Sequence, residues 1–279
     1  MSFVEQRIVS GAPAALVWQG VGNDGEPFDP GVVSAEIVLQ DGSSAAAVAS
    51  GEGVGPRGVV LSAAQTSQLG PLSVSGSAGG VEVGRSVAEV VGGLYFSNAQ
   101  LRAAEQSVSD ATKFPASLVA IARQQVEARI ERWTGRAFVP RFKRVRVQRG
   151  ANGLVALPGY DVRAVRSIVG ADGLVPLEGV EVVAGGLRVP GLSGSALAGV
   201  EYGLDAPPAD LRAAAMRLCR EVLARSKGGG LPENAISYTS TEAGWSAVLV
   251  TPGVRGAFTA IPEVNEVVGG YVLDEALIA

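Results

Sequence analysis

The chain has 279 residues, of which 47% are apolar and 18% are charged, and its net charge is −4. It contains no histidine and one cysteine, which excludes Ser-His-Asp and Cys-His catalysis, imidazole metal sites and an intrachain disulfide. At roughly 100–200 residues per domain, this length predicts two compact units.

The first part of the chain, residues 1–94, is expected to form a small antiparallel β-sandwich. Turn signals such as Asp41-Gly42 and Gly79-Gly80 separate apolar runs of the length of a strand. The runs lie at residues 15–18, 32–33, 36–39, 58–61 and 81–83. Trp18 ends one of these runs, which favours a place in the core over a surface for stacking a ligand.

The balance of charge changes along the chain and supports a division into domains. Residues 1–111 carry four basic and eleven acidic residues, a net charge of −7. Residues 112–279 carry nineteen basic and sixteen acidic residues, a net charge of +3. The composition shifts near residues 100–112, and we begin the second domain at residue 95, just before the first helical segment.

Residues 95–230 predict three helices, over about 98–106, 115–134 and 207–226, with a β region inserted at 138–202. Pro115 suits the first turn of the middle helix, and Gly135 suits its C-terminal end. Apolar residues recur in this helix at spacings of three and four, which is typical of one buried face: Val119, Ala122, Val126, Ile130 and Trp133. The chain is thus expected to be α+β, a sandwich followed by a helical-bundle domain with a β insertion.

Residues 231–279 show no sustained hydrophobic period, and they contain three prolines and several acidic residues. Such a segment is expected to be an extended C-terminal tail that is either disordered or ordered by docking on a partner.

Motifs for catalysis and for cofactor binding are absent from the sequence. No lysine follows a glycine, so there is no Gly-Lys-Ser/Thr phosphate loop, and Cys219 has no partner for nucleophilic chemistry. No run of about 20 apolar residues predicts a membrane span, and no basic and apolar N-terminal pattern predicts a signal peptide. We therefore expect a protein that is not an enzyme and that uses no cofactor, metal ion or membrane.

The strongest positive signal is an arginine cluster. Nine basic residues lie between Arg123 and Arg149 against Glu127 and Glu131, which gives a local net charge of +7, and eight of the nine are arginine. Three interpretations are open: a solvated face, a contact surface for an acidic protein, and a site for DNA phosphates. Arginine side chains make forked, bidentate contacts, which favours a protein partner over simple attraction of charge.

Several short segments of residues 95–279 follow one another in an ordered series. They are SDATKFP (109–115), IERWTGRAFVPR (130–141), LVALP (154–158), VRSI (165–168), VEYG (200–203), PPADLRAA (207–214), TPG (251–253) and IPEVNEVV (261–268). Taken in this order, they resemble the head-to-tail connector (adaptor) proteins of long-tailed bacteriophages, in particular those of the actinobacteriophage type. Residues 1–94 are not part of the minimal adaptor.

The resemblance implies a structural virion protein. It implies a small helical bundle with an inserted β region, assembled as a twelve-subunit ring in the phage neck. The partners it implies are the portal protein, a stopper or tail-completion protein, neighbouring copies of the same chain, and genome DNA that passes through without specific binding. The protein would be assembled in the host cytoplasm and located in the virion.

A ring requires a repeated contact between two different surfaces of the chain. We expect two groups of residues to contribute to the interfaces. The first is an arginine face that meets acidic groups of a neighbour or of the portal: Arg129, Arg132, Arg136, Arg141 and Arg144. The second is the C-terminal segment that reaches the portal: Ile261, Pro262, Val264, Val267 and Val268.

Two alternatives of a different class stay open. The first is a nucleic-acid-binding protein that uses the basic cluster from Arg123 to Arg149, which would bind DNA in a salt-dependent way. The second is a surface module whose β domain holds a carbohydrate or protein ligand near Trp18 or Tyr95.

Overall fold

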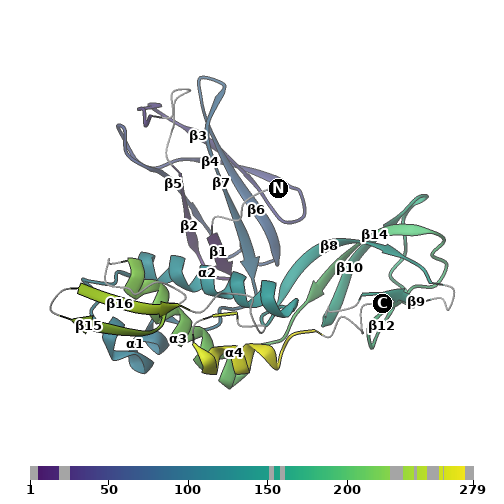
Figure 1. Ribbon diagram of the computed structural model, residues 1–279. Helices are drawn as coiled ribbons and strands as arrows, with labels where there is room; N and C mark the ends of the chain where they lie inside the picture. The colour runs from purple at the N-terminus through teal and green to yellow at the C-terminus, as the bar shows by residue number, and fades with distance from the viewer. Residues whose placement is uncertain are drawn as a thin grey trace. The chain divides into compact units, whose positions relative to one another are not determined.

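The computed structural model describes residues 6–18, 26–150, 154–157, 161–226, 235–241, 244–249, 258–259 and 261–273. The fold is mixed α+β, with several sheets and four α-helices among these residues (Figure 1). Contacts divide the chain into two compact units. Unit 1 comprises Met1–Gly93, Val139–Leu157 and Val162–Asp205, and unit 2 comprises Leu94–Phe138, Pro158–Asp161 and Ala206–Ala279.

The N-terminal strands of unit 1 form two sheets that share one core. The strands are β1 (Gln6–Val9), β2 (Ala14–Trp18), β3 (Ser34–Val38), β4 (Ser44–Val48), β5 (Arg57–Leu61), β6 (Gly70–Ala78) and β7 (Val81–Val91). One sheet has the order β1-β7-β6-β3-β4, and β2 pairs with β5 in the other. Side chains alternate between the two faces of a strand, so Leu16, Ile37 and Val74 lie in the shared core together with Trp18.

Strand β1 makes the larger sheet mixed. It pairs with β7 in parallel, from Gln6 opposite Ala88 to Val9 opposite Val91. The expectation of an antiparallel arrangement is therefore wrong for this pair. The physical reason is the connection: β1 leads to β2 in the other sheet, so no hairpin imposes an antiparallel direction on β1 beside β7.

Two strands of this sheet had no signal in the sequence. Strands β4 and β6 are rich in alanine, serine and glycine, which are not strand-favouring residues. Both pair with β3, one on each side, over the whole of its length. Their place in the sheet is decided by pairing with a strand of better propensity.

The remaining strands of unit 1 form two smaller sheets. They are β8 (Arg141–Gln148), β9 (Leu154–Ala156), β10 (Val162–Gly170), β11 (Gly173–Leu174), β12 (Glu181–Val183), β13 (Gly186–Arg188) and β14 (Ser195–Tyr202). One sheet has the order β11-β10-β14-β8 and the other has the order β12-β13-β9. Figure 1 shows β10, β14 and β8 side by side as the long strands of one sheet. The strands expected as an insertion in the helical domain thus group with the N-terminal strands in unit 1.

Unit 2 is mainly helical. Its elements are α1 (Asn98–Ala104), the 3-10 turn η1 (Gln106–Val108), α2 (Ala116–Thr134), α3 (Ala209–Ser226), β15 (Ala235–Thr241), β16 (Gly244–Leu249) and α4 (Pro262–Gly269). Local signals determine the helix ends. The Ser97 hydroxyl accepts a hydrogen bond from the Gln100 amide and the Gln100 side chain accepts one from the Ser97 amide, which forms a capping box. Gly135 ends α2 with a φ of 70°, a left-handed conformation that glycine adopts without strain.

The C-terminal segment contains a helix that packs in unit 2. Helix α4 contacts α2 and α3, and its Val264 and Val268 are fully buried. The Asn265 side chain accepts hydrogen bonds from the amides of Phe258 (3.0 Å) and Thr259 (2.7 Å), which fixes the approach to the helix. The expectation of an extended tail is therefore wrong for residues 262–269. An apolar pair four residues apart in so short a helix gives too weak a periodic signal to be recognised.

The packing of α4 leads to a first prediction. Val268→Asp places a carboxylate in an apolar site without a partner, which costs several kcal/mol. We expect this variant to release α4, so that the backbone amides of residues 261–273 exchange hydrogen much faster than in the wild type. The matched control is Val272→Asp, because Val272 is 41% exposed. Equal exchange in both variants and the wild type would show that α4 is not held by this side chain.

Candidate functional site

The expected arginine face is divided between the two units. Arg129 and Arg132 lie on α2 and Arg136 follows its C-terminal cap, all in unit 2, whereas Arg141 and Arg144 lie on β8 in unit 1. Arg132 and Arg144 are exposed, and the other three are partly buried. The five residues therefore belong to two separate structural units and do not lie on one helix or strand.

Two members of the set form ion pairs inside their own unit. An Arg136 amino group lies 2.9 Å from Asp161 in unit 2. Arg141 contacts Glu89 in unit 1 through two guanidinium nitrogens, one of them at 2.8 Å. Both arginines thus stabilise the fold, and the exposed cations Arg132 and Arg144 are better placed to meet a partner.

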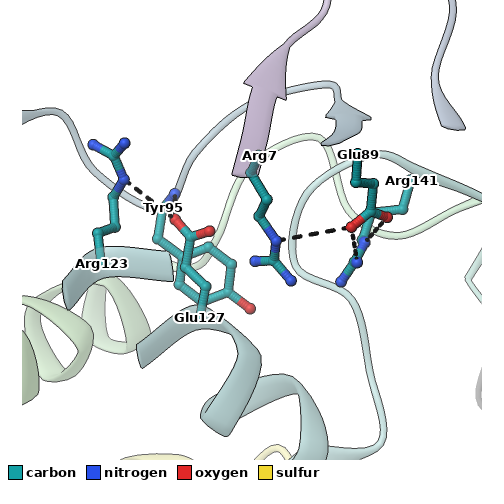
Figure 2. A network of polar contacts seen from close by, with 6 residues as sticks. All are labelled: Arg7, Glu89, Tyr95, Arg123, Glu127 and Arg141. Carbon is teal, nitrogen blue, oxygen red and sulfur yellow. Dashed lines mark hydrogen bonds and ion pairs between the residues drawn. The ribbon is translucent and has the colours of Figure 1, made fainter. Parts of the chain in front are cut away.

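Glu89 is a buried carboxylate that joins three strands of unit 1. It alternates on β7 with Ala88 and Val90, which point into the core, so its side chain lies on the opposite face of the sheet. Arg141 of β8 pairs with it there, and Arg7 of β1 approaches it to 3.9 Å (Figure 2). A bidentate guanidinium is the strongest partner for a carboxylate that has lost its water. This pair therefore holds β8 against the five-stranded sheet.

A second buried carboxylate, Glu127, lies in unit 2 (Figure 2). It is 1% exposed, accepts a hydrogen bond from the Tyr95 amide at 3.0 Å, and lies 3.8 Å from Arg123. Arg123 also donates to the Phe96 carbonyl oxygen at 3.2 Å. Burial lowers the pKa of Arg123, and the charge of Glu127 opposes that shift. The first basic residue of the cluster thus connects α2 to the segment before α1.

A groove of about 620 Å³ lies between the outer face of the five-stranded sheet and the start of β8. Its cationic side chains are Arg85, Arg141, Lys143 and Arg144, and Glu89 is its single acid. Its apolar residues include Val38, Pro71, Val87 and Phe142. Because Glu89 is already paired with Arg141, the groove has an excess of positive charge beside an apolar surface, a combination that suits a ligand carrying both carboxylates and apolar groups.

Phe142 is fixed in this groove by the neighbouring strands. The Arg166 guanidinium lies 4.8 Å from the centre of the Phe142 ring and donates to Glu201 at 2.6 Å and to the Leu69 carbonyl oxygen at 2.8 Å. Gly70 and Gly199 leave room for the ring, since a Cβ at either position would lie 2.9 Å or 3.2 Å from it. The apolar part of the groove is therefore preformed.

The five expected C-terminal interface residues differ in their exposure. Val264 and Val268 are fully buried inside unit 2, so a partner that meets the folded unit does not reach them. Ile261 and Val267 are partly buried, and Pro262 is exposed. The exposed side of α4 is instead acidic, because Glu263 and Glu266 point away from the core.

The aromatic residues considered for a ligand site are both in the interior: Trp18 is 6% exposed and Tyr95 is 1% exposed. Within the described ranges, no group of three or more His, Cys, Asp or Glu side chains is placed to hold a metal ion. None of the helices in the described part of the chain combines the length and the apolar character needed to cross a membrane.

In comparisons with known proteins, the chain matches no protein-family model, and no curated protein is detectably similar to it.

Sequence reasoning missed the part of the groove contributed by β7. Arg85 and Glu89 precede the arginine cluster by more than thirty residues, and no motif marks them. A sheet brings residues together through strand pairing, so a lone arginine and a lone glutamate on one strand carried no signal of their own.

The buried Glu89 contact leads to a second prediction. Glu89→Gln keeps the shape of the side chain but removes its charge, so Arg7 and Arg141 lose the carboxylate that they share. We expect this variant to lower the free energy of unfolding by about 3 kcal/mol, measured by urea denaturation.

The control is Glu181→Gln, because the Glu181–Arg188 pair has the same chemistry with side chains that are 59% and 65% exposed. Its loss is expected to change stability by less than about 1 kcal/mol. Equal effects of the two substitutions would contradict the role given to Glu89.

The third prediction concerns Cys219, which is free and buried on α3. Burial raises the pKa of this thiol to about 12, so almost no thiolate is present at neutral pH. We expect no reaction with a disulfide reagent at pH 8 in the native protein and one reacted thiol per chain in denaturant, followed by absorbance. Rapid reaction of the native protein would show that the α2–α3 packing opens readily.

Proposed function

We propose that this chain is a structural protein of the bacteriophage neck, a head-to-tail connector that forms a twelve-subunit ring. In this proposal the ring joins the portal to a stopper or tail-completion protein, genome DNA passes through it without specific binding, and the chain is not an enzyme. It would be assembled in the host cytoplasm and located in the virion.

One observation carries the proposal. The segments 130–141, 207–214 and 261–268, which carry much of the resemblance to connectors, fall at the end of α2, at the start of α3 and in α4. These three helices contact one another in unit 2, although β strands separate them in the chain. A small helical bundle whose helices are separated in sequence by a β region is the core that the resemblance implies.

The arrangement of the N-terminal strands belongs to the same proposal. The two sheets share a single core, which is the expected organisation of a β-sandwich, with β1 added in parallel. We propose that this accessory domain precedes the helical bundle as an addition to the minimal connector.

The division of the arginine cluster weighs against the nucleic-acid alternative. A protein that reads the DNA backbone gathers its cations along one groove or one helix face. Here Arg123, Arg136 and Arg141 are engaged with groups of their own unit. The ligand-binding alternative is weakened by the burial of Trp18 and Tyr95.

The fourth prediction tests the proposed function with the full-length protein. We expect its mass in solution, measured by light scattering, to change from a small species to a stoichiometric ring when the portal protein of the same phage genome is added. A chain whose mass in solution does not change on addition of the portal protein, at any concentration, would contradict the proposal.

Arg132→Glu is the informative variant of this experiment, because Arg132 is exposed on α2. It is expected to weaken ring formation while the variant keeps its fold. Gln125→Glu, also exposed on α2, is the matched control for added negative charge and should assemble normally.

A further inference from the structure

The groove of unit 1 has positive charge that the fold does not neutralise. Arg85, Lys143 and Arg144 are exposed along it, and neither Arg85 nor Arg144 forms an ion pair with any residue that the structure describes. Its one acid, Glu89, is bound by Arg141 and Arg7. A second set of acidic groups would therefore find Arg85 and Arg144 around a partly desolvated surface, where ion pairs are stronger than in open water.

The apolar residues of the groove restrict the class of molecule that can bind in it. Val87 and the fixed ring of Phe142 lie beside the cations. A nucleic acid backbone presents phosphates without apolar side chains, whereas a protein segment presents both carboxylates and aliphatic groups. The volume, about 620 Å³, accommodates a few side chains and not a whole domain. The groove thus fits a short acidic protein segment.

The same chain carries a segment of that kind on its other unit. Helix α4 exposes Glu263 and Glu266, three residues apart and hence on one side of the helix, with the partly buried Val267 beside them. Neither glutamate forms an ion pair among the described residues. Residues 256–279 contain four acidic residues and no lysine or arginine, so nothing in that sequence offsets their charge.

We infer that the groove of one copy binds the acidic side of α4 of a neighbouring copy. The inference rests on the proposed function, since a closed ring needs two different, complementary surfaces on every chain, repeated from copy to copy. The acidic side of α4 is available for this contact because Val264 and Val268 hold the opposite side of the helix in its own unit. The charges of the two surfaces are complementary, because the Glu263 and Glu266 carboxylates meet Arg85 and Arg144.

Two reciprocal variants test this contact. Arg85→Glu with Arg144→Glu reverses the groove, and Glu263→Arg with Glu266→Arg reverses the helix. All four side chains are exposed, so both variants are expected to keep the wild-type circular dichroism and unfolding midpoint. Each variant alone should require at least about tenfold more protein for half-maximal assembly under the conditions in which the wild type assembles, because like charges then face each other.

Mixing the two variants in equal amounts should restore assembly. Each reversed groove then meets a reversed helix, and each native groove meets a native helix, in an alternating ring. Restoration by mixing requires the contact to lie between copies. Recovery only when all four substitutions are in the same chain, with none on mixing, would overturn the inference in favour of a contact inside one chain.

The controls are Arg146→Glu, an exposed residue of β8 outside the groove, and Glu52→Arg, an exposed residue outside α4. Both should assemble as the wild type does. Variants of groove and helix that also assemble normally would overturn the inference and leave the connector proposal standing.

A wild-type chain that self-associates through this contact but ignores the portal would support the inference and contradict the connector proposal. Duplex DNA is the remaining probe. The inference is overturned if three results occur together: the wild type binds duplex DNA, the groove variant alone loses that binding, and the helix variant assembles normally. The groove is then a site for phosphates.

Discussion

The structure of unit 1 depends on one buried carboxylate. Glu89 lies on the face of the five-stranded sheet away from the core, where a charged side chain would normally remain in water. It is buried because β8 covers it, and β8 can do so only by supplying Arg141 as a counter-ion. A hydrogen bond from the Gly92 amide to the Pro140 carbonyl oxygen continues the same contact. The groove and its cations exist because this pair holds the two sheets together.

Unit 2 also contains a buried carboxylate paired with an arginine, and here both residues lie on a helix. Glu127 is buried on α2 and satisfied by the Tyr95 amide and by Arg123, so the segment before α1 is fixed to the longest helix of the unit. The C-terminal helix is held by apolar packing and by a hydrogen bond from the Tyr271 hydroxyl to Asp210 at the start of α3. Each unit thus has charged groups in its interior that serve the fold, which leaves fewer of them for partners.

This use of charge changes the functional interpretation of the basic cluster. The number of arginines between residues 123 and 149 suggests one large cationic surface. Arg123, Arg136 and Arg141, however, form contacts with groups of their own unit. Arg144 of the cluster is exposed in the groove, where it lies with Arg85, a residue outside the cluster in sequence. A groove whose cations come from β7 and β8, with an apolar part fixed by Arg166, is suited to a protein segment. The proposed ring of identical chains needs two complementary surfaces on each chain, and this groove is our candidate for one of them.

The sequence by itself determined the mixed α+β class and the positions of α1, α2 and α3, because their ends are set by local residues such as Ser97 and Gly135. It did not determine the parallel pairing of β1, strands β4 and β6, or helix α4, whose local signals are weak. Only the tertiary structure decided which charges are buried and which are exposed. Glu89 and Arg141 are 52 residues apart, and no local pattern relates residues that meet through sheet packing.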